Sequence, residues 1–194
     1  MLLSPETIDY CPLYCEENIW RLCQHQYFVD KSIVVCFISN STKSCAIWQQ
    51  RSAGNPLEPV IWDYHVVLLV KDFNQANEGI WQVYDLDSNL PLGISVTEYF
   101  LQSFQPPEQG RLSQIRVAPQ FSPYFKLIDG NDYVEQFSSD REHMQNADGS
   151  WQSPPPLWPL IVGNRTLSLQ RLTNFNGDDV LSLSQLEQRL VDLL

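Results

Sequence analysis

The chain of 194 residues is 43% hydrophobic, 12% aromatic and 18% charged, a composition that supports a packed core rather than a disordered or coiled-coil chain. Its formal net charge of −11 argues against a nucleic-acid partner, because phosphate binding requires clustered Lys and Arg. No stretch approaches the ~20 apolar residues of a membrane helix, and no secretory signal opens the chain. We therefore expect one domain over residues 1–194, a monomer without membrane contact, in the cytoplasm and also in the nucleus if the source is eukaryotic.

The five cysteines all fall in the first quarter of the chain, at Cys11, Cys15, Cys23, Cys36 and Cys45. An odd number of cysteines without an export signal indicates free thiols in a reducing compartment. Three of them lie close to a histidine in the sequence, but they form no C-x-x-C pair and their spacing fits no common zinc module. We therefore expect no bound metal.

The segment Cys15–Cys23 is predicted to be a helix. Apolar side chains recur at Cys15, Ile19, Leu22 and Cys23, which places them in one stripe along the helix. Two glutamates in the first turn have the charge that the start of a helix favours.

Three strands are predicted to follow, over Ser32–Ser39, Val60–Val70 and Ile80–Leu86, because these runs are apolar and rich in β-branched residues. The polar loop between the second and third strands ends in glycine and indicates a hairpin. Further on we expect a helix over 97–104 capped by Thr97, a strand over 114–118, a helix over 131–137, a proline-rich loop over 151–159, and a final helix over 182–194 with a Ser184–Glu187 capping box. One helix followed by a sheet and mixed elements predicts an α+β domain with a central, mainly antiparallel sheet.

Cys15 is the cysteine best placed for chemistry. A thiolate is the nucleophilic form of cysteine, and the positive end of a helix dipole favours it. Cys15 stands at a predicted helix start, whereas Cys36 lies inside an apolar strand and is expected to be a core residue. Core packing remains the alternative for Cys15, since free cysteine is among the most buried residue types.

The predicted hairpin adds two partners for this thiol. If its loop is centred on Gln75, paired residues have numbers that sum to 150, and His65 lies opposite Asp85 on the same face. Asp63 and Asp87 are the competing acids, each one alternation away. A buried His–Asp pair can be purely structural, but Cys, His and Asp in this layout are typical of cysteine enzymes.

Several motifs in chain order make the sequence similar to the WDYHV family, the protein N-terminal glutamine amidohydrolases. They are Tyr14-Cys-Glu-Glu-Asn-Ile-Trp20, Trp62-Asp-Tyr-His-Val66, Tyr84-Asp-Leu-Asp87, Phe137-Ser-Ser-Asp-Arg-Glu-His-Met144 and Pro154-Pro-Pro156. The resemblance extends from about Tyr10 to Pro159 and is weaker after Leu160.

This resemblance implies a papain- or transglutaminase-like fold in which Cys15 is the nucleophile, His65 the base and Asp85 the orienting acid. It implies a thiol amidohydrolase that converts the N-terminal glutamine of protein or peptide substrates to glutamate with release of ammonia, as a step in N-degron pathways. The chemistry requires no metal and no organic cofactor.

Two other classes of protein fit the same residues. A cysteine peptidase or a transglutaminase-like enzyme can be built from the same triad, and composition does not separate them. A module that binds protein N-termini without catalysis would not need a nucleophilic thiol.

Three carboxylates are candidates for binding the free α-ammonium of a substrate, namely Glu16, Glu17 and Asp63. For the two glutamates, complementing the helix dipole is an equal alternative. Trp62 and Tyr64 are expected to face away from His65 and to pack in the core.

Asp140, Arg141 and His143 lie in one of the shared motifs without an assigned role. For Arg141, a structural lock onto a carboxylate and a contact with substrate are both open.

Overall fold

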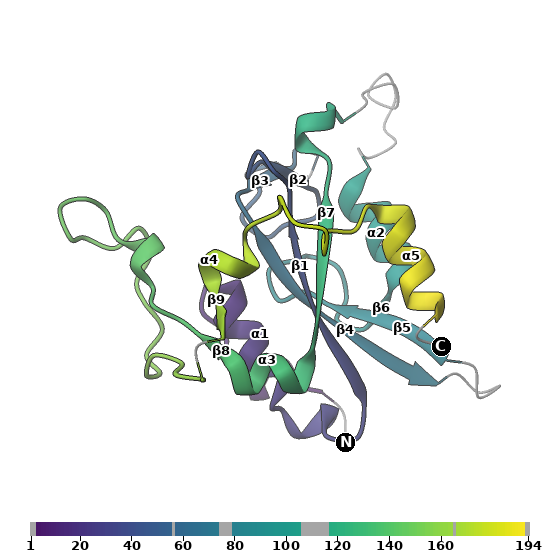
Figure 1. Cartoon of the computed structure of the whole chain (residues 1–194), viewed down its shortest axis with the longest axis horizontal. Coiled ribbons are helices and arrows are strands. Elements are labelled where there is room, and N and C mark those ends of the chain that lie inside the picture. The colour runs from purple at the N-terminus through teal and green to yellow at the C-terminus, as the bar shows by residue number, and fades with distance from the viewer. Residues whose placement is uncertain (1–2, 56, 74–78, 106–116, 165, 193–194) are drawn as a thin grey trace.

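The computed structural model describes residues 3–55, 57–73, 79–105, 117–164 and 166–192, and a five-stranded sheet forms its centre (Figure 1). The strand order is β6-β5-β4-β1-β7, and each strand pairs antiparallel with its neighbours. The strands are β1 (Ser32–Ser39), β4 (His65–Phe73), β5 (Gly79–Tyr84), β6 (Ile94–Ser95) and β7 (Tyr124–Asp129). With its helices, this sheet confirms the predicted α+β class.

Helices cover both faces of the sheet. Figure 1 shows α1 and α3 on one side of it and α2 and α5 on the other. The helices are α1 (Cys15–Cys23), α2 (Val96–Phe104), α3 (Gly130–Gln136), α4 (Leu169–Leu172) and α5 (Leu183–Asp192). Among the residues that the structure describes, no helix is both long and apolar enough to cross a membrane.

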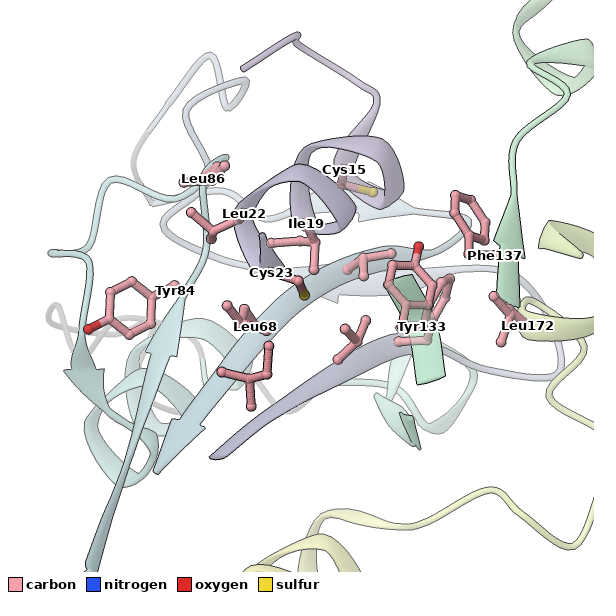
Figure 2. Close-up of a cluster of buried hydrophobic side chains, with 14 of the residues drawn as sticks. Cys15, Ile19, Leu22, Cys23, Leu68, Tyr84, Leu86, Tyr133, Phe137 and Leu172 are labelled. Carbon is pink, nitrogen blue, oxygen red and sulfur yellow. The ribbon is translucent and has the colours of Figure 1, made fainter. Parts of the chain in front are cut away.

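This layering explains the continuous apolar run of β4. Successive side chains of a strand point to opposite faces of the sheet. Val66, Leu68 and Val70 belong to the core under α1, whereas Val67 and Leu69 belong to the core under α2. Figure 2 shows Ile19, Leu22 and Cys23 of α1 directed toward Leu68. The helix that begins at Cys15 is thereby held against the strand that begins at His65.

The predicted strand Val60–Val70 is two strands. β3 (Val60–Trp62) pairs with β2 (Cys45–Ile47) in a separate two-stranded sheet, and β4 starts only at His65. Between them, Oδ1 of Asp63 accepts a hydrogen bond from the backbone N–H of Tyr64 at 2.9 Å. Such a local bond competes with the ladder of a strand, so the chain bends at this point.

The hairpin register differs from the predicted one. β4 and β5 pair residues whose numbers sum to 152, from Leu68 with Tyr84 to Phe73 with Gly79. β5 also ends at Tyr84, so Asp85 lies one residue beyond the strand rather than opposite His65. A shift of two residues leaves the paired side chains of β4 and β5 on their expected faces, because the alternation has a period of two.

Several terminal and capping predictions also need correction. Residues 114–116 of a predicted strand lie outside the described residues, 117–118 form no strand, and the edge strand is β7 instead. Helix α2 is capped by Ser95 rather than Thr97. In the capping box of α5, Ser182 and Gln185 exchange side chain–backbone hydrogen bonds, in place of Ser184 and Glu187.

The remaining elements are short. Two strands, β8 (Phe137–Ser138) and β9 (Leu167–Ser168), form a parallel pair. The 3-10 turns are η1 (Pro5–Thr7), η2 (Gln26–Phe28), η4 (Pro119–Phe121) and η5 (Glu142–Met144).

Candidate active site

Cys15 is the first residue of α1 and opens onto a cavity of about 360 Å³. The residue before it, Tyr14, provides no side-chain cap, and Leu13 has a φ of 66° in the left-handed region. A leucine in this region costs about 1–2 kcal/mol, so the turn that presents the thiol is strained. Beside Cys15, the lining of the cavity includes Leu13, Trp62, Asp63, Tyr64, His143 and Met144.

The environment of Cys15 disfavours the thiolate. Burial and the neighbouring Glu16 carboxylate raise the pKa of its thiol well above the ordinary value. The thiol donates a long hydrogen bond of 3.7 Å to Oε2 of Glu16, while the backbone N–H of Val66 acts in the opposite direction and favours the thiolate. The expected helix-dipole effect, at most about 2 kcal/mol, is therefore outweighed, and the resting thiol is neutral. It needs a base to become a nucleophile.

His65 and Asp85 form the predicted pair. Nε2 of His65 lies 2.9 Å from Oδ1 of Asp85, and both side chains are almost fully buried. This contact was predicted from a register that proved wrong; it forms because the chain leaves β5 at Tyr84 and the Asp85 carboxylate turns toward His65.

Four donors hold the Asp85 carboxylate. Oδ1 accepts from His65 and from the backbone N–H of Asp87 at 3.0 Å. Oδ2 accepts from the Tyr99 hydroxyl at 2.8 Å and from Nε2 of Gln50 at 3.1 Å. Burial raises the pKa of Asp85, but the charge and hydrogen bond of His65 and the other side-chain donors outweigh it and lower the pKa. Asp85 is therefore a fixed, ionised carboxylate.

The second nitrogen of His65 is free. Burial alone would lower the pKa of His65, but the charge and hydrogen bond of Asp85 outweigh it, so the pKa is raised. Asp85 accepts a hydrogen bond from Nε2, and this bond selects the tautomer of His65 that carries its proton on Nε2. Nδ1 is buried and has no hydrogen-bond partner among the described residues. An unpaired buried lone pair of this kind can accept a proton.

Trp62 departs from its expected position. Its ring stacks on the imidazole of His65, with ring centroids 5.0 Å apart, because the bend before β4 brings both side chains to one side. Its indole N–H is buried and has no acceptor within the described part of the chain. Since Trp62 also lines the cavity, this free donor points to a role beyond core packing.

Glu17 is engaged within the protein. Its carboxylate receives Nε and Nη2 of Arg141 at 2.7 and 2.8 Å, and the indole N–H of Trp158 at 2.7 Å. Glu17 has no exposed surface and Arg141 is 7% exposed. Arg141 is thus a structural lock, and Glu17 is removed from the candidate substrate contacts because its charge is already paired.

The other two carboxylates stay beside the cavity. Glu16 is fully buried and accepts a hydrogen bond of 3.0 Å from the Tyr64 hydroxyl. Asp63 is exposed and lies in the bend before β4, not on the same strand as His65 as expected. His143, which had no predicted role, lies 3.1 Å from the Tyr64 hydroxyl and 3.8 Å from Glu16. Asp140 accepts the backbone N–H of Glu142 and shapes the turn into η5.

The ligand atoms of His65, Asp85 and Asp87 lie within 4.8 Å of one another, close enough to hold an ion. The donors around them account for this arrangement. Asp85 accepts four hydrogen bonds, and Oδ1 of Asp87 accepts one of 2.6 Å from the Tyr10 hydroxyl. A carboxylate surrounded by N–H and O–H donors suits a hydrogen-bond network better than a metal site, whose ligands must present free lone pairs.

Sequence reasoning missed Gln50 and Tyr99, which support Asp85, because no local pattern connects them with it. The shared motifs contained Trp62 and His143, so the motifs were the signal for these two. All five cysteines are free thiols, as predicted.

Comparisons with known proteins agree with the motifs. A family model described as N-terminal glutamine amidase matches residues 10–189. The chain is similar to proteins named protein N-terminal glutamine amidohydrolase from several animals. It is 37% identical to that of Danio rerio over 156 residues, which cover 78% of this chain and 71% of the relative. The identity is 39% with Bos taurus and 38% with Homo sapiens, each over 166 residues that cover 82% of this chain and 74% and 75% of the relatives.

Proposed function

Because this chain belongs to the N-terminal glutamine amidase family, we propose that it hydrolyses the side-chain amide of a glutamine at the N-terminus of a protein or peptide. The products are an N-terminal glutamate and ammonia. We further propose that the reaction proceeds through a thioester on Cys15, with His65 as the base and Asp85 as the orienting acid.

One observation carries this assignment of roles. Nδ1 of His65 is a buried base that has no hydrogen-bond partner in the described part of the chain, and Asp85 holds the ring in a single tautomer through the other nitrogen. The backbone N–H that lies close to the Cys15 sulfur belongs to Val66, the next residue after His65. We propose that Nδ1 accepts the thiol proton.

In the first half of the reaction, the Cys15 sulfur attacks the amide carbon as its proton passes to Nδ1. The oxyanion forms at the start of α1, where backbone N–H groups and the free indole N–H of Trp62 are the candidate donors. His65 then returns the proton to the amide nitrogen, the carbon–nitrogen bond breaks, and ammonia leaves a thioester.

In the second half, His65 removes a proton from water, which attacks the thioester carbon. The carbon–sulfur bond breaks, the thiol regains its proton, and a carboxylic acid is released. A helix that begins at the nucleophile and packs on an antiparallel sheet supports the proposal of a papain- or transglutaminase-like fold. No step of this proposal requires a metal or an organic cofactor.

Mass spectrometry of a glutamine-initiated peptide tests this function. The peptide should gain about one mass unit with stoichiometric ammonia, and peptides with internal glutamine or N-terminal asparagine should react poorly. Cys15→Ala should abolish the reaction, whereas Cys11→Ala, four residues upstream, should retain it. Equal activity on internal glutamine, or full activity of Cys15→Ala, would refute the proposal.

A further inference from the structure

The side chains of Glu16, Tyr64 and His143 lie near Cys15 and have no part in the proposed chemistry. Glu16, on the first turn of α1, places its carboxylate among side chains that line the cavity. Oε2 lies 3.0 Å from the Tyr64 hydroxyl and 3.7 Å from the Cys15 sulfur, and Oε1 lies 3.8 Å from Nε2 of His143. The carboxylate therefore stands directly behind the wall of the cavity.

One oxygen of this carboxylate lacks a donor. The hydroxyl of Tyr64 has a single proton, and it donates this proton to Oε2 of Glu16. The 3.1 Å contact between Tyr64 and His143 must then use a proton on Nε2 of His143. At 3.8 Å, His143 is too far from Oε1 of Glu16 for a hydrogen bond. Oε1 is thus a buried acceptor without a partner among the described residues.

Burial also makes the charge of Glu16 costly. Burial raises the pKa of Glu16 to about 7, even though its own backbone N–H and the hydrogen bond from Tyr64 oppose this rise. Within the described residues no Lys or Arg forms an ion pair with Glu16, and Arg141 is committed to Glu17. A bound cation with N–H donors would satisfy both the orphan oxygen and the charge.

We propose that Glu16 binds the α-ammonium group of the first residue of the substrate, an inference that rests on the proposed function. In glutamine, the α-nitrogen and the side-chain amide carbon are separated by four bonds, so they are at most about 5 Å apart. The Cys15 sulfur lies 3.7 Å from Oε2 of Glu16. This separation allows the sulfur to reach the side-chain amide carbon while the ammonium of the same residue reaches the carboxylate. Only a first residue carries this ammonium, so Glu16 would distinguish it from internal glutamine.

His143 is the side chain that must move. Its Nε2 lies 3.8 Å from Oε1 and its side chain is 28% exposed, so we infer that it turns toward solvent to admit the ammonium. The weak 3.8 Å contact is then replaced by a charge-assisted hydrogen bond. Burial lowers the pKa of His143, which keeps its ring neutral and avoids a second positive charge beside the ammonium.

The test compares two peptides that differ only in the group on the α-carbon of the first residue. The first begins with glutamine, and in the second a hydroxyl replaces the α-amine of that residue. We expect the wild type to prefer the amine, measured as a ratio of kcat/KM, and Glu16→Gln to lower this ratio at least about tenfold. Asp63→Asn removes the same charge from an exposed carboxylate of the same cavity and should change the ratio less than about threefold.

The outcomes are separable. Absence of deamidation by the wild type would refute the proposed function, whereas equal turnover of both peptides by the wild type would refute only the ammonium site. A collapse of the ratio in Asp63→Asn but not in Glu16→Gln would assign the ammonium to Asp63 and overturn the inference. Thermal unfolding checks that the variants fold. If Glu16→Gln does not fold, Glu16→Asp takes its place: it keeps the charge but withdraws the carboxylate by one methylene, so the ratio should fall, and an unchanged ratio there would equally overturn the inference.

Discussion

Replacing Arg141 by Met should destabilise the folded state by about 3–5 kcal/mol, because it leaves the Glu17 carboxylate buried without its charge partner. Glu17 has no exposed surface, and it loses two hydrogen bonds of 2.7 and 2.8 Å in this variant. The indole N–H of Trp158 remains as one donor, so we expect a loss toward the lower end of this range.

For a chain of this length, such a loss corresponds to a decrease in Tm of roughly 6–20 °C. Lys31→Met provides the matched control, since it breaks an ion pair of 2.7 Å whose side chains are 22% and 31% exposed. Exposed pairs contribute about 0–1 kcal/mol, so this variant should unfold close to the wild type. Thermal and urea unfolding, followed by circular dichroism, measure both variants.

The double variant Glu17→Gln/Arg141→Met gives a stricter check. With the carboxylate also removed, no uncompensated charge remains, and the double variant should be more stable than Arg141→Met alone. If Arg141→Met lost less than about 1 kcal/mol, like the exposed control, the reasoning from burial would be refuted. Because Glu17 belongs to the first turn of α1, this bridge connects the helix of Cys15 to the segment that carries Arg141.

Three further predictions concern catalysis. Asp85→Asn should lower kcat about 10²–10⁴-fold without unfolding the protein, because the tautomer of His65 is no longer fixed; near-normal turnover would contradict the role of the pair. In the wild type, kcat/KM should fall as the pH drops through the raised pKa of His65, since Nδ1 must be unprotonated to accept the thiol proton. In Asp85→Asn this acid limb should move to lower pH, because the negative charge that raises the pKa of His65 is gone. If the acid limb of Asp85→Asn stays at the wild-type pH, a group other than His65 is responsible for it. Trp62→Phe should lower kcat about 10²-fold with little change in KM, whereas an unchanged kcat would return Trp62 to the core.

Much of the architecture follows from local pattern. The apolar stripe of α1, the continuous apolar runs of β1 and β4, and the antiparallel hairpin were all predictable, because the periods of helix and strand are properties of neighbouring residues. The contact between His65 and Asp85 was predicted from an incorrect register, and it forms because the chain leaves β5 at Tyr84 and the Asp85 carboxylate turns toward His65.

Features that depend on distant segments could not be predicted in this way. Arg141 reaches Glu17 across 124 positions of the chain, and nothing in the sequence near either residue indicates that pairing. The neutral state of Cys15 was equally hidden: a helix start alone favours a thiolate, and only the packing of the thiol against β4 beside Glu16 reverses the preference. Burial sets the cost of a charge, and burial is known only once the elements are placed against one another. The types and order of the candidate functional residues were therefore readable from the chain, while their protonation states and partners arise from the folded arrangement.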